Sequence, residues 1–283
     1  MNHRSPVFVS RNNPKIKQIR SLRQRKGRDE TGLFIVEGIR HIGEAVEAGM
    51  QIDSLSYAPD LLSSAYALEL LAQQQARGTT CLALETAIFT SLADKENPQG
   101  ILAVVRKPVW SLTQLHPDNF PWGVALVAPQ DPGNIGTILR TIDAVGANGL
   151  LLLENSADPY HPSAVRASMG ALFWVPVIQA SFADFLQWSK GNSYTLYGTS
   201  AHDSHDYCLV EQYHFPLILL LGSEREGLSS EQRQACDLLL RLPMHGRATS
   251  LNLAVAAGVI LYAMENSIAD RGNQSEGRTS AKE

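Results

Sequence analysis

The chain has 283 residues, 44% of them hydrophobic, and a formal net charge of −4. This size and composition suit one large domain or two small ones with real cores. The sequence has no apolar run long enough to cross a bilayer, no apolar leader and only three widely spaced cysteines, which argues against a membrane protein, a secreted protein and a disulfide framework. We therefore expect a cytoplasmic protein without a membrane partner.

Charge is distributed unevenly along the chain. Residues 1–40 hold ten Lys and Arg against three Asp and Glu, a local charge of +7, and the remaining residues carry −11. Such polarity indicates a polyanionic partner for the N-terminal part. Residues 12–26 are predicted to form a basic helix. Its charged side could bind phosphates, or it could simply be a solvated helix face.

The first hundred residues alternate predicted helices and strands. After the basic helix, we expect strands at 33–36, 52–57, 79–84 and 101–105, and helices at 37–48 and 61–76. This alternation is long enough for a small α/β domain over residues 1–107. Prolines and polar residues then break the periodicity, and we place a linker at 108–120.

The second part continues the α/β alternation over residues 121–268. Predicted strands lie at 124–128, 150–153, 194–198, 217–221 and 238–242, and predicted helices at 135–145, 161–169, 182–188 and 250–268. Residues 173–178 form a further apolar run. The continuous apolar run at 217–221 is typical of a strand buried on both faces. The polar residues 269–283 are predicted to be a disordered tail.

Three loops in the second part carry most of the functional information. They are Asp131-Pro-Gly-Asn-Ile-Gly-Thr-Ile-Leu-Arg140, Leu220-Leu-Gly-Ser-Glu-Arg-Glu-Gly227 and Leu242-Pro-Met-His-Gly-Arg-Ala-Thr-Ser-Leu-Asn252. Each follows a predicted strand and is dense in Gly, Pro, Asn or Ser. If these strands are neighbours, the loops meet at one edge of the sheet, where ligands of α/β folds bind.

Several standard chemistries do not fit these loops. The sequence has no G-x-G-x-x-G dinucleotide fingerprint, no G-x-S-x-G nucleophile elbow and no H-E-x-x-H zinc motif. Gly222 and Gly227 have the spacing of a P-loop, but Leu228 stands where its lysine is needed. His202 and His205 lack further ligands at metal-binding spacing, so no metal is expected.

The loops favour a neutral or mixed ligand. Their glycines allow close backbone approach, main-chain amides could bind an adenine edge, and leucines could cover its faces. Two of the polar residues also have a purely structural interpretation. Ser250 could be the N-cap of the last helix, and Asn134 could cap the helix after the first loop.

With these residues the chain resembles the SpoU (TrmH-like) branch of the SPOUT superfamily, RNA ribose 2′-O-methyltransferases that use S-adenosylmethionine. The three loops match the family's motifs in order, spacing and content, and Arg166-Ala-Ser-Met-Gly170 is also similar. Residues 1–107 resemble the family's RNA substrate-binding domain through Asn13-Pro-Lys-Ile-Lys17, Phe34-Ile-Val-Glu-Gly38 and Pro98-Gln-Gly-Ile101. The resemblance implies a parallel-sheet catalytic domain with a C-terminal trefoil knot, in a homodimer whose active site lies at or near the subunit interface.

The resemblance also implies roles for individual residues. The methyl donor should contact Gly222, Leu242 and Leu251, with Thr199, Leu221 and Met244 as neighbours. The catalytic or structural motif positions are those of Asn134, Arg140, Glu224, Ser250 and Asn252. Arg140 occupies the position that, in this family, is proposed to activate the ribose hydroxyl. Because a guanidinium releases its proton with difficulty, we also consider that Arg140 binds the adjacent phosphate and stabilises the developing alkoxide.

RNA contacts are expected from Arg11, Lys15, Lys17, Arg23 and Arg166, although Arg166 could instead pair with an acid. The first domain favours ribosomal RNA over transfer RNA as the substrate. Three alternatives stay open at this point: a transfer RNA 2′-O-methyltransferase, a SPOUT enzyme that acts on a base, and a SPOUT-fold RNA-binding protein without this activity.

Overall fold

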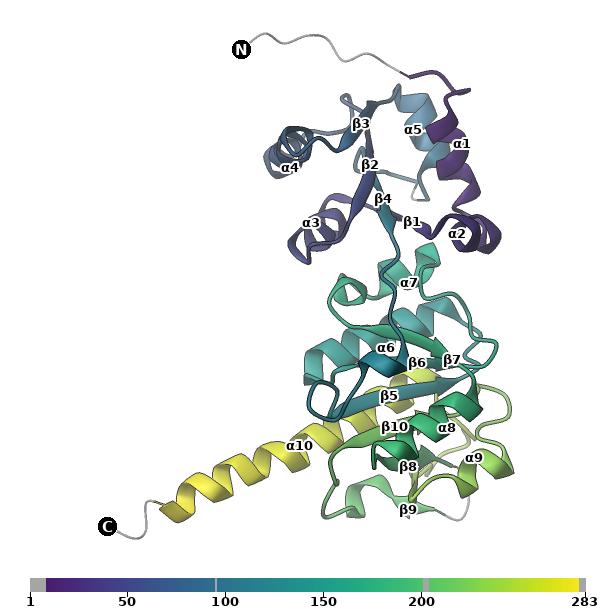
Figure 1. Ribbon diagram of the computed structural model, residues 1–283, viewed down its shortest axis with the longest axis vertical. Helices are drawn as coiled ribbons and strands as arrows, with labels where there is room; N and C mark the ends of the chain where they lie inside the picture. Colours follow the sequence, from purple (N-terminus) through teal and green to yellow (C-terminus); the bar gives the residue numbers. More distant parts are fainter. Residues whose placement is uncertain (1–8, 95, 201–203, 280–283) are drawn as a thin grey trace. The chain divides into compact units, whose positions relative to one another are not determined.

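The computed structural model describes residues 9–94, 96–200 and 204–279. The chain forms two compact units (Figure 1), and it passes between them three times. Unit 1 consists of Met1–Val109 and Asp158–Phe173, and unit 2 consists of Trp110–Ala157 and Trp174–Glu283. Each unit is an α/β fold, as predicted.

Unit 1 is built on a four-stranded mixed sheet. The strands are β1 (Leu33–Glu37), β2 (Ile52–Tyr57), β3 (Thr80–Ala83) and β4 (Ile101–Arg106), in the order β1-β4-β2-β3. β4 is antiparallel to both β1 and β2, and β2 and β3 are parallel. The helices are α1 (Pro14–Ser21), α2 (Arg25–Thr31), α3 (Ile39–Glu47), α4 (Ala65–Ala76) and α5 (Thr86–Leu92). All four predicted strands are confirmed.

The predicted basic helix is two helices rather than one. Gln24, the residue before α2, is extended, and the chain turns between α1 and α2. A Cβ on Gly27 would lie 2.3 Å from the carbonyl oxygen of Ser21, so the start of α2 touches the end of α1 at a point where only glycine fits. Leu22, between the helices, is fully buried with Ile16 and Ile19 of α1 against α5.

The segment Asp158–Phe173 of unit 1 comes from the middle of the chain. It contains α7 (Pro162–Ala167) and the single turn η2 (Ala171–Phe173). The ring of Phe34 in β1 lies 4.8 Å from that of Tyr160 and 6.5 Å from that of Phe173. The segment thus supplies aromatic partners to an apolar side chain of β1.

A buried ion pair joins the segment Asp158–Phe173 to α2. The Arg28 side chain, 1% exposed, donates from Nε to Asp158 Oδ2 over 2.6 Å and from Nη1 to the carbonyl oxygens of Leu22 and Arg23. Asp158 also accepts a hydrogen bond from the amide of Tyr160. Because both charges are removed from water, each depends on the other.

Unit 2 is built on a seven-stranded sheet in which every pair of strands is parallel. The strands are β5 (Trp122–Val127), β6 (Gly149–Leu153), β7 (Val177–Ala180), β8 (Thr195–Thr199), β9 (His205–Asp206), β10 (Leu217–Leu221) and β11 (Leu238–Arg241). Their order is β7-β6-β5-β10-β8-β11-β9. The parallel sheet confirms the predicted fold class, and the trefoil knot stays a prediction.

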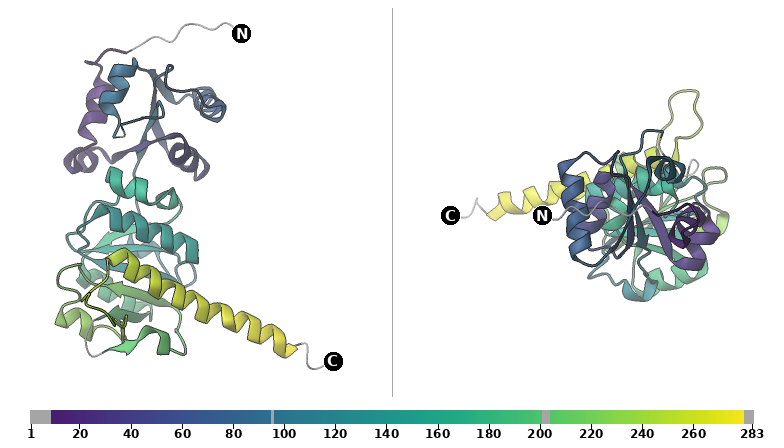
Figure 2. Two further views of the ribbon diagram at one scale, coloured as in Figure 1. Left: turned by 180° about the vertical axis from the view of Figure 1, so that it is seen from behind. Right: turned by 90° about the horizontal axis from the view of Figure 1, so that it is seen from above.

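Helices cover both faces of the unit 2 sheet. α8 (Phe182–Gly191), η1 (Leu112–Gln114) and the end of α9 (Ser230–Gln234) pack on the face that carries Ala125 and Leu151. α6 (Pro132–Val145) packs on β6, and α10 (Leu253–Thr279) packs on α6 (Figures 1 and 2). This double coverage explains the continuous apolar strands seen in the sequence.

Two segments differ from their predicted character. Most of the expected linker 108–120 packs in unit 2, because Leu115 and Phe120 enter its core and Trp188 donates its indole N–H to the Leu115 carbonyl. α10 runs to Thr279 and so includes residues 269–279, for which the composition predicted disorder. Extending an existing helix fixes fewer torsions per hydrogen bond than starting one. Residues 280–283 lie outside the described residues.

The buried pair predicts selective destabilisation of unit 1. Asp158→Asn leaves the Arg28 guanidinium buried without its counter-charge and should cost about 3–5 kcal/mol of unfolding free energy. All four tryptophans, Trp110, Trp122, Trp174 and Trp188, lie in unit 2. In urea, far-UV circular dichroism should therefore show an early transition that tryptophan fluorescence does not. Glu30→Gln, in the exposed Lys26–Glu30 pair, is the control and should change neither signal. Equal shifts in both signals would contradict the prediction.

Candidate active site

The three loops meet at the carboxyl edge of the unit 2 sheet. β5 precedes the first loop, β10 the second and β11 the third, and all three strands run in the same direction. The expectation that these strands are neighbours holds only for β5 and β10. β8 lies between β10 and β11, and its end, at Thr199, therefore becomes part of the site.

A chain of hydrogen bonds through Asn134 joins the loops. Asn134 Nδ2 donates to Glu224 Oε1 over 3.2 Å, and Asn252 Nδ2 donates to Asn134 Oδ1 over 3.0 Å. The second carboxylate oxygen of Glu224 accepts from the backbone amide of Gln130 over 3.3 Å. Asn134 is buried and uses both ends of its amide group. One residue of each loop thus takes part in a single network.

The structure assigns the helix caps to other residues than the two considered in the sequence. Asp131 caps α6, because its side chain accepts from the Gly133 amide, whereas Asn134 lies within the helix. Asn252 precedes α10, and its Oδ1 accepts from the amides of Ala254 and Val255. The capping interpretations of Asn134 and Ser250 were therefore wrong, and Asn252 both caps α10 and holds Asn134.

A cleft of about 450 Å³ opens between the loops, within the size range of small-molecule sites. The three residues expected to contact the methyl donor and the three expected beside it all line this cleft, namely Gly222, Leu242, Leu251, Thr199, Leu221 and Met244. Ser250 lines it too. So do Ser200, Leu240 and Ile260, which the sequence did not single out because they lie at strand ends or inside a helix. The mixture of apolar side chains and loop backbone suits an adenosine-like ligand.

Gly222 is sterically required where the second loop turns. A Cβ on this residue would lie 2.1 Å from the carbonyl carbon of Gly227 and 2.3 Å from the nitrogen of Leu228. The loop closes on itself through hydrogen bonds between the backbones of Ser223 and Gly227, of 3.2 and 3.0 Å. This tight turn presents backbone atoms to the cleft.

A second cleft, of about 560 Å³, lies on the other side of the same loop. It is lined by Ala128, Gln130, Asp131, Asn134, Ser223, Glu224, Arg225 and Glu226. Residues 223–226 line both clefts and form their shared wall. The wall gives a ligand in each cleft access to the same few side chains.

Arg140 is the predicted catalytic residue that neither lines a cleft nor belongs to the Asn134 network. It lies on α6, is exposed to solvent, and lines neither cleft. Of the five predicted catalytic positions, Asn134, Glu224 and Asn252 form the network and Ser250 lines the first cleft. Their chemical roles stay predictions.

The basic residues predicted to bind RNA differ in their surroundings. Lys15 Nζ lies 2.7 Å from Asp53 Oδ2, so this charge is paired within unit 1. Arg11 and Lys17 are exposed, and neither has an ion pair with a residue of the described ranges. These two side chains remain available for a phosphate.

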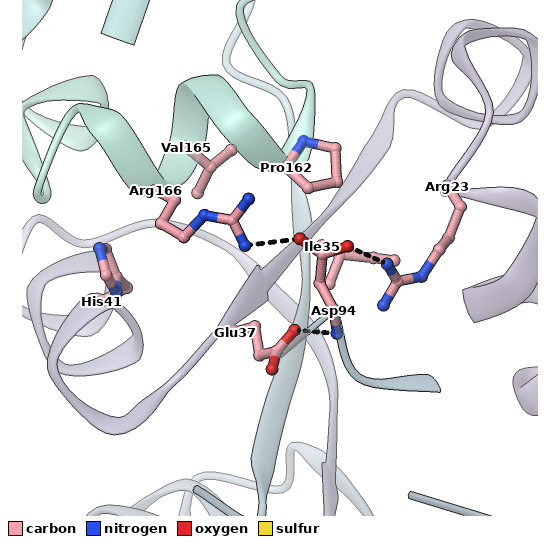
Figure 3. Close-up of a pocket in the computed structure, with 8 residues that line it drawn as sticks. All are labelled: Arg23, Ile35, Glu37, His41, Asp94, Pro162, Val165 and Arg166. Atoms are coloured by element: carbon pink, nitrogen blue, oxygen red, sulfur yellow. Dashed lines mark hydrogen bonds and ion pairs between the residues drawn. The ribbon is translucent and has the colours of Figure 1, made fainter. Parts of the chain in front are cut away.

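Arg23 and Arg166 share one carboxylate (Figure 3). Arg23 Nη1 lies 2.9 Å from Asp94 Oδ1, and Arg166 Nη1 lies 2.5 Å from Asp94 Oδ2. Burial alone would raise the pKa of Asp94, but the hydrogen bond and charge of Arg166, followed by those of Arg23, lower it overall. The Glu37 carboxylate accepts from the Asp94 amide over 2.7 Å, and the space between these groups is only about 20 Å³. The alternative that Arg166 pairs with an acid is confirmed.

Among the described residues, no three or more His, Cys, Asp or Glu side chains are arranged to hold a metal ion. His202 lies outside those residues. Nor does any helix in the described ranges have the length and apolarity to cross a membrane.

Comparison with known proteins decides the family. The model of the SpoU rRNA Methylase family matches residues 121–262, and that of the MRM3-like substrate binding domain matches residues 13–103. A 23S rRNA (uridine(2479)-2′-O)-methyltransferase of Streptomyces viridochromogenes is 37% identical over 250 residues, covering 85% of each chain. The chain belongs to the SpoU methyltransferase family.

Other relatives agree with this membership. The 23S rRNA (guanosine(2553)-2′-O)-methyltransferase RlmP of Bacillus subtilis is 29% identical over 261 residues, which are 89% of this chain and 96% of that protein. The structure of an AdoMet-bound rRNA methyltransferase from Sinorhizobium meliloti superposes with a TM-score of 0.83 and 35% identity, covering 92% of this chain and 97% of that one. The predicted family and its methyl donor, S-adenosylmethionine, are confirmed, and the cleft fits that donor in size and lining.

The tight turn at Gly222 predicts that adding a single side-chain methyl group to this residue weakens donor binding. Gly222→Ala should weaken S-adenosylmethionine binding at least about tenfold and lower the free energy of unfolding by about 1–3 kcal/mol, because the added atom overlaps backbone. Gly246→Ala is the matched control in the third loop, since a Cβ there meets nothing within 4 Å. Calorimetric titration measures both variants, and equal affinities would contradict the steric requirement.

The Asn134 network predicts a rescue by a second substitution. Asn134→Asp places an acceptor against the Glu224 carboxylate and should reduce donor affinity about tenfold or more, since the two acceptors repel each other. Adding Glu224→Gln restores a donor–acceptor pair, with its amide donating to residue 134 and its oxygen accepting from Gln130. The double variant should regain most of the affinity. A double variant weaker than either single one would show that the loops are not joined in this way.

Proposed function

We propose that this SpoU family member transfers the methyl group of S-adenosylmethionine to a ribose 2′-hydroxyl of ribosomal RNA. The observation that carries the proposal is the hydrogen-bonded network of Asn134, Glu224 and Asn252 beside a donor-sized cleft. Two relatives with more than four-fifths of this chain aligned are named as 23S rRNA 2′-O-methyltransferases. A substrate-binding domain match over residues 13–103 agrees with an RNA substrate.

Positioning is the main chemical task of the site. When bound, S-adenosylmethionine would supply the methyl carbon, with S-adenosylhomocysteine as the leaving group and the hydroxyl proton passing to water. The protein would have to hold the 2′-hydroxyl in line with the methyl group. Residues 223–226 separate the cleft that would hold the donor from the second cleft, so a hydroxyl in the second cleft would have to reach the methyl group around this wall. We assign the target nucleotide to the second cleft.

We assign Arg140 to the phosphate beside the target ribose and to the developing alkoxide. A guanidinium can donate several hydrogen bonds to such oxygens without giving up its proton. Arg140 lies outside both clefts of its own chain, so this role requires a second subunit.

We propose that the second subunit is another copy of this chain. Along α10, Val255, Val259 and Tyr262 follow one another at helical spacing and are 52%, 37% and 50% exposed. Such an apolar stripe on a helix suits burial against a partner. α10 packs on α6, the helix that carries Arg140, so a homodimer formed through these helices would hold Arg140 close to the interface.

The exposed basic residues Arg11 and Lys17 of unit 1 would bind the RNA backbone. Arg23 and Arg166 would do so only in competition with Asp94. A cytoplasmic location, in the compartment of the ribosomal RNA, completes the proposal.

The direct test is mass-spectrometric nucleoside analysis of ribosomal and transfer RNA from cells with and without the gene. Loss of one 2′-O-methylnucleoside from the ribosomal fraction is the expected result. Loss from the transfer fraction would replace the proposed substrate by transfer RNA. Loss of a methylated base, or no loss with donor binding intact, would favour base modification or an RNA-binding role without this activity.

The role of Arg140 predicts a separation of binding from chemistry. When the Arg140→Ala variant is expressed in cells that lack the gene, methylation should be about a hundredfold or more lower than with the parent protein. The reason is that the group that stabilises the alkoxide is gone. The variant's affinity for S-adenosylmethionine should stay within about twofold of the parent, since Arg140 does not line the donor cleft. Lys190→Ala, an exposed cation on α8, is the control. A variant that methylates normally would remove Arg140 from the proposed chemistry.

A further inference from the structure

One cation stands in the wall between the two clefts. Arg225 lies between Glu224 and Glu226 in the second loop and lines both the 450 Å³ and the 560 Å³ cleft. It is exposed, and within the part of the chain that the structure describes its guanidinium has no hydrogen bond or ion pair. A guanidinium without a partner among the described residues, at the junction of two clefts, is available to a ligand.

The surroundings make this charge important. The second cleft is lined by three carboxylates, those of Asp131, Glu224 and Glu226, and among the described residues Arg225 is the one basic residue that lines it. Glu224 is hydrogen-bonded to Asn134 and Gln130, and Asp131 caps α6, so neither of these acids pairs with Arg225. Without Arg225 the cleft would repel a polyanion.

Other arginines do not replace it. Arg233, which lines the donor cleft, donates to the Leu228 carbonyl over 2.9 Å and to the Ser230 hydroxyl over 3.2 Å, which holds it against the start of α9. Arg140 lies outside both clefts of its own chain. Arg225 is therefore the free cation of the shared wall.

We propose that Arg225 binds a backbone phosphate of the target nucleotide and so draws the ribose to the wall that faces the donor. The inference rests on the proposed function, because it assigns the second cleft to RNA. A phosphate fits better than the carboxylate of the donor, since the second cleft must admit a polyanion past three acids and has no other cation. Arg225 is on this basis a substrate-binding residue of the methyl transfer that the family resemblance did not single out.

The test compares Arg225→Gln, Arg225→Lys and the control Lys190→Gln, which removes one exposed positive charge from α8. The probes are the ribosomal RNA fraction of cells that lack the gene and S-adenosylmethionine alone. The measurements are the KM for RNA, kcat, the salt dependence of RNA binding by filter retention, and the donor Kd by calorimetry. Thermal unfolding of each variant checks folding, which an exposed side chain should not disturb.

For Arg225→Gln we expect the KM for RNA to rise roughly ten- to a hundredfold, as for the loss of a hydrogen-bonded charge contact. The slope of log affinity against log salt should decrease by about 0.7–0.9, the signature of one phosphate contact. The donor Kd should stay within about twofold. Arg225→Lys should bring the KM for RNA part of the way back to the parent value and restore the full salt slope. Lysine keeps the positive charge but cannot form the paired hydrogen bonds of a guanidinium. Lys190→Gln should change none of these values.

Three outcomes would overturn the inference. An unchanged KM and salt slope in Arg225→Gln would remove the phosphate contact. A weakened donor Kd with an unchanged salt slope would assign Arg225 to the donor carboxylate instead. An equal effect of Lys190→Gln would make the loss a general charge effect. A parent protein that binds the donor but neither binds nor methylates RNA would instead contradict the proposed function itself, so the two failures are distinguishable.

Discussion

The amide of Asn134 is the constraint on which the active site depends. It joins Glu224 and Asn252, residues 90 and 118 positions away in the sequence, and it is buried with both of its ends bonded. A parallel sheet brings the carboxyl ends of its strands to one edge, but this does not fix the loops that follow. The buried amide does fix them, because any movement of one loop would leave a polar group without a partner in a place that water does not reach freely.

The fixed loops divide the edge of the sheet into two compartments with a common wall. The wall is short because Ser223, at its start, bonds to Gly227, the residue after its end, and because Gly222 lets the following backbone approach closely. Its backbone is thus held while the side chains of residues 224–226 remain at the surface. Direct methyl transfer requires the hydroxyl oxygen within about 3–3.5 Å of the methyl carbon, so the two ligands would have to meet at the edge of this wall, where no backbone lies between them. The carboxylate of Glu224 stabilises the wall, and the adjacent Arg225 is left for a ligand.

The family resemblance supplied the residues expected around the donor cleft, and β9 was not predicted. Local patterns in the sequence were sufficient to predict most of the other strands and the three loops. These features follow from apolar runs and turn residues that lie next to each other in the chain. Features set by distant partners could not be predicted in this way. Asp94 lies 71 residues from Arg23 and 72 from Arg166, so nothing near either arginine indicates that it is paired. The placement of β8 between β10 and β11 is likewise a property of the whole sheet. For Asn134, two residue types with good capping chemistry lie three positions apart, and only the structure shows that Asp131 is the cap.

The excursion Asp158–Phe173 has a consequence for the modularity of the protein. Although unit 1 has the size and sheet of an independent module, it is not encoded by one continuous stretch. A gene shortened at residue 109 would separate Phe34 from Tyr160 and Phe173, and Arg28 from Asp158. The substrate-binding unit of this chain therefore cannot be exchanged by joining a new N-terminal segment to an unchanged remainder. Any such exchange has to carry a compatible α7 segment with it.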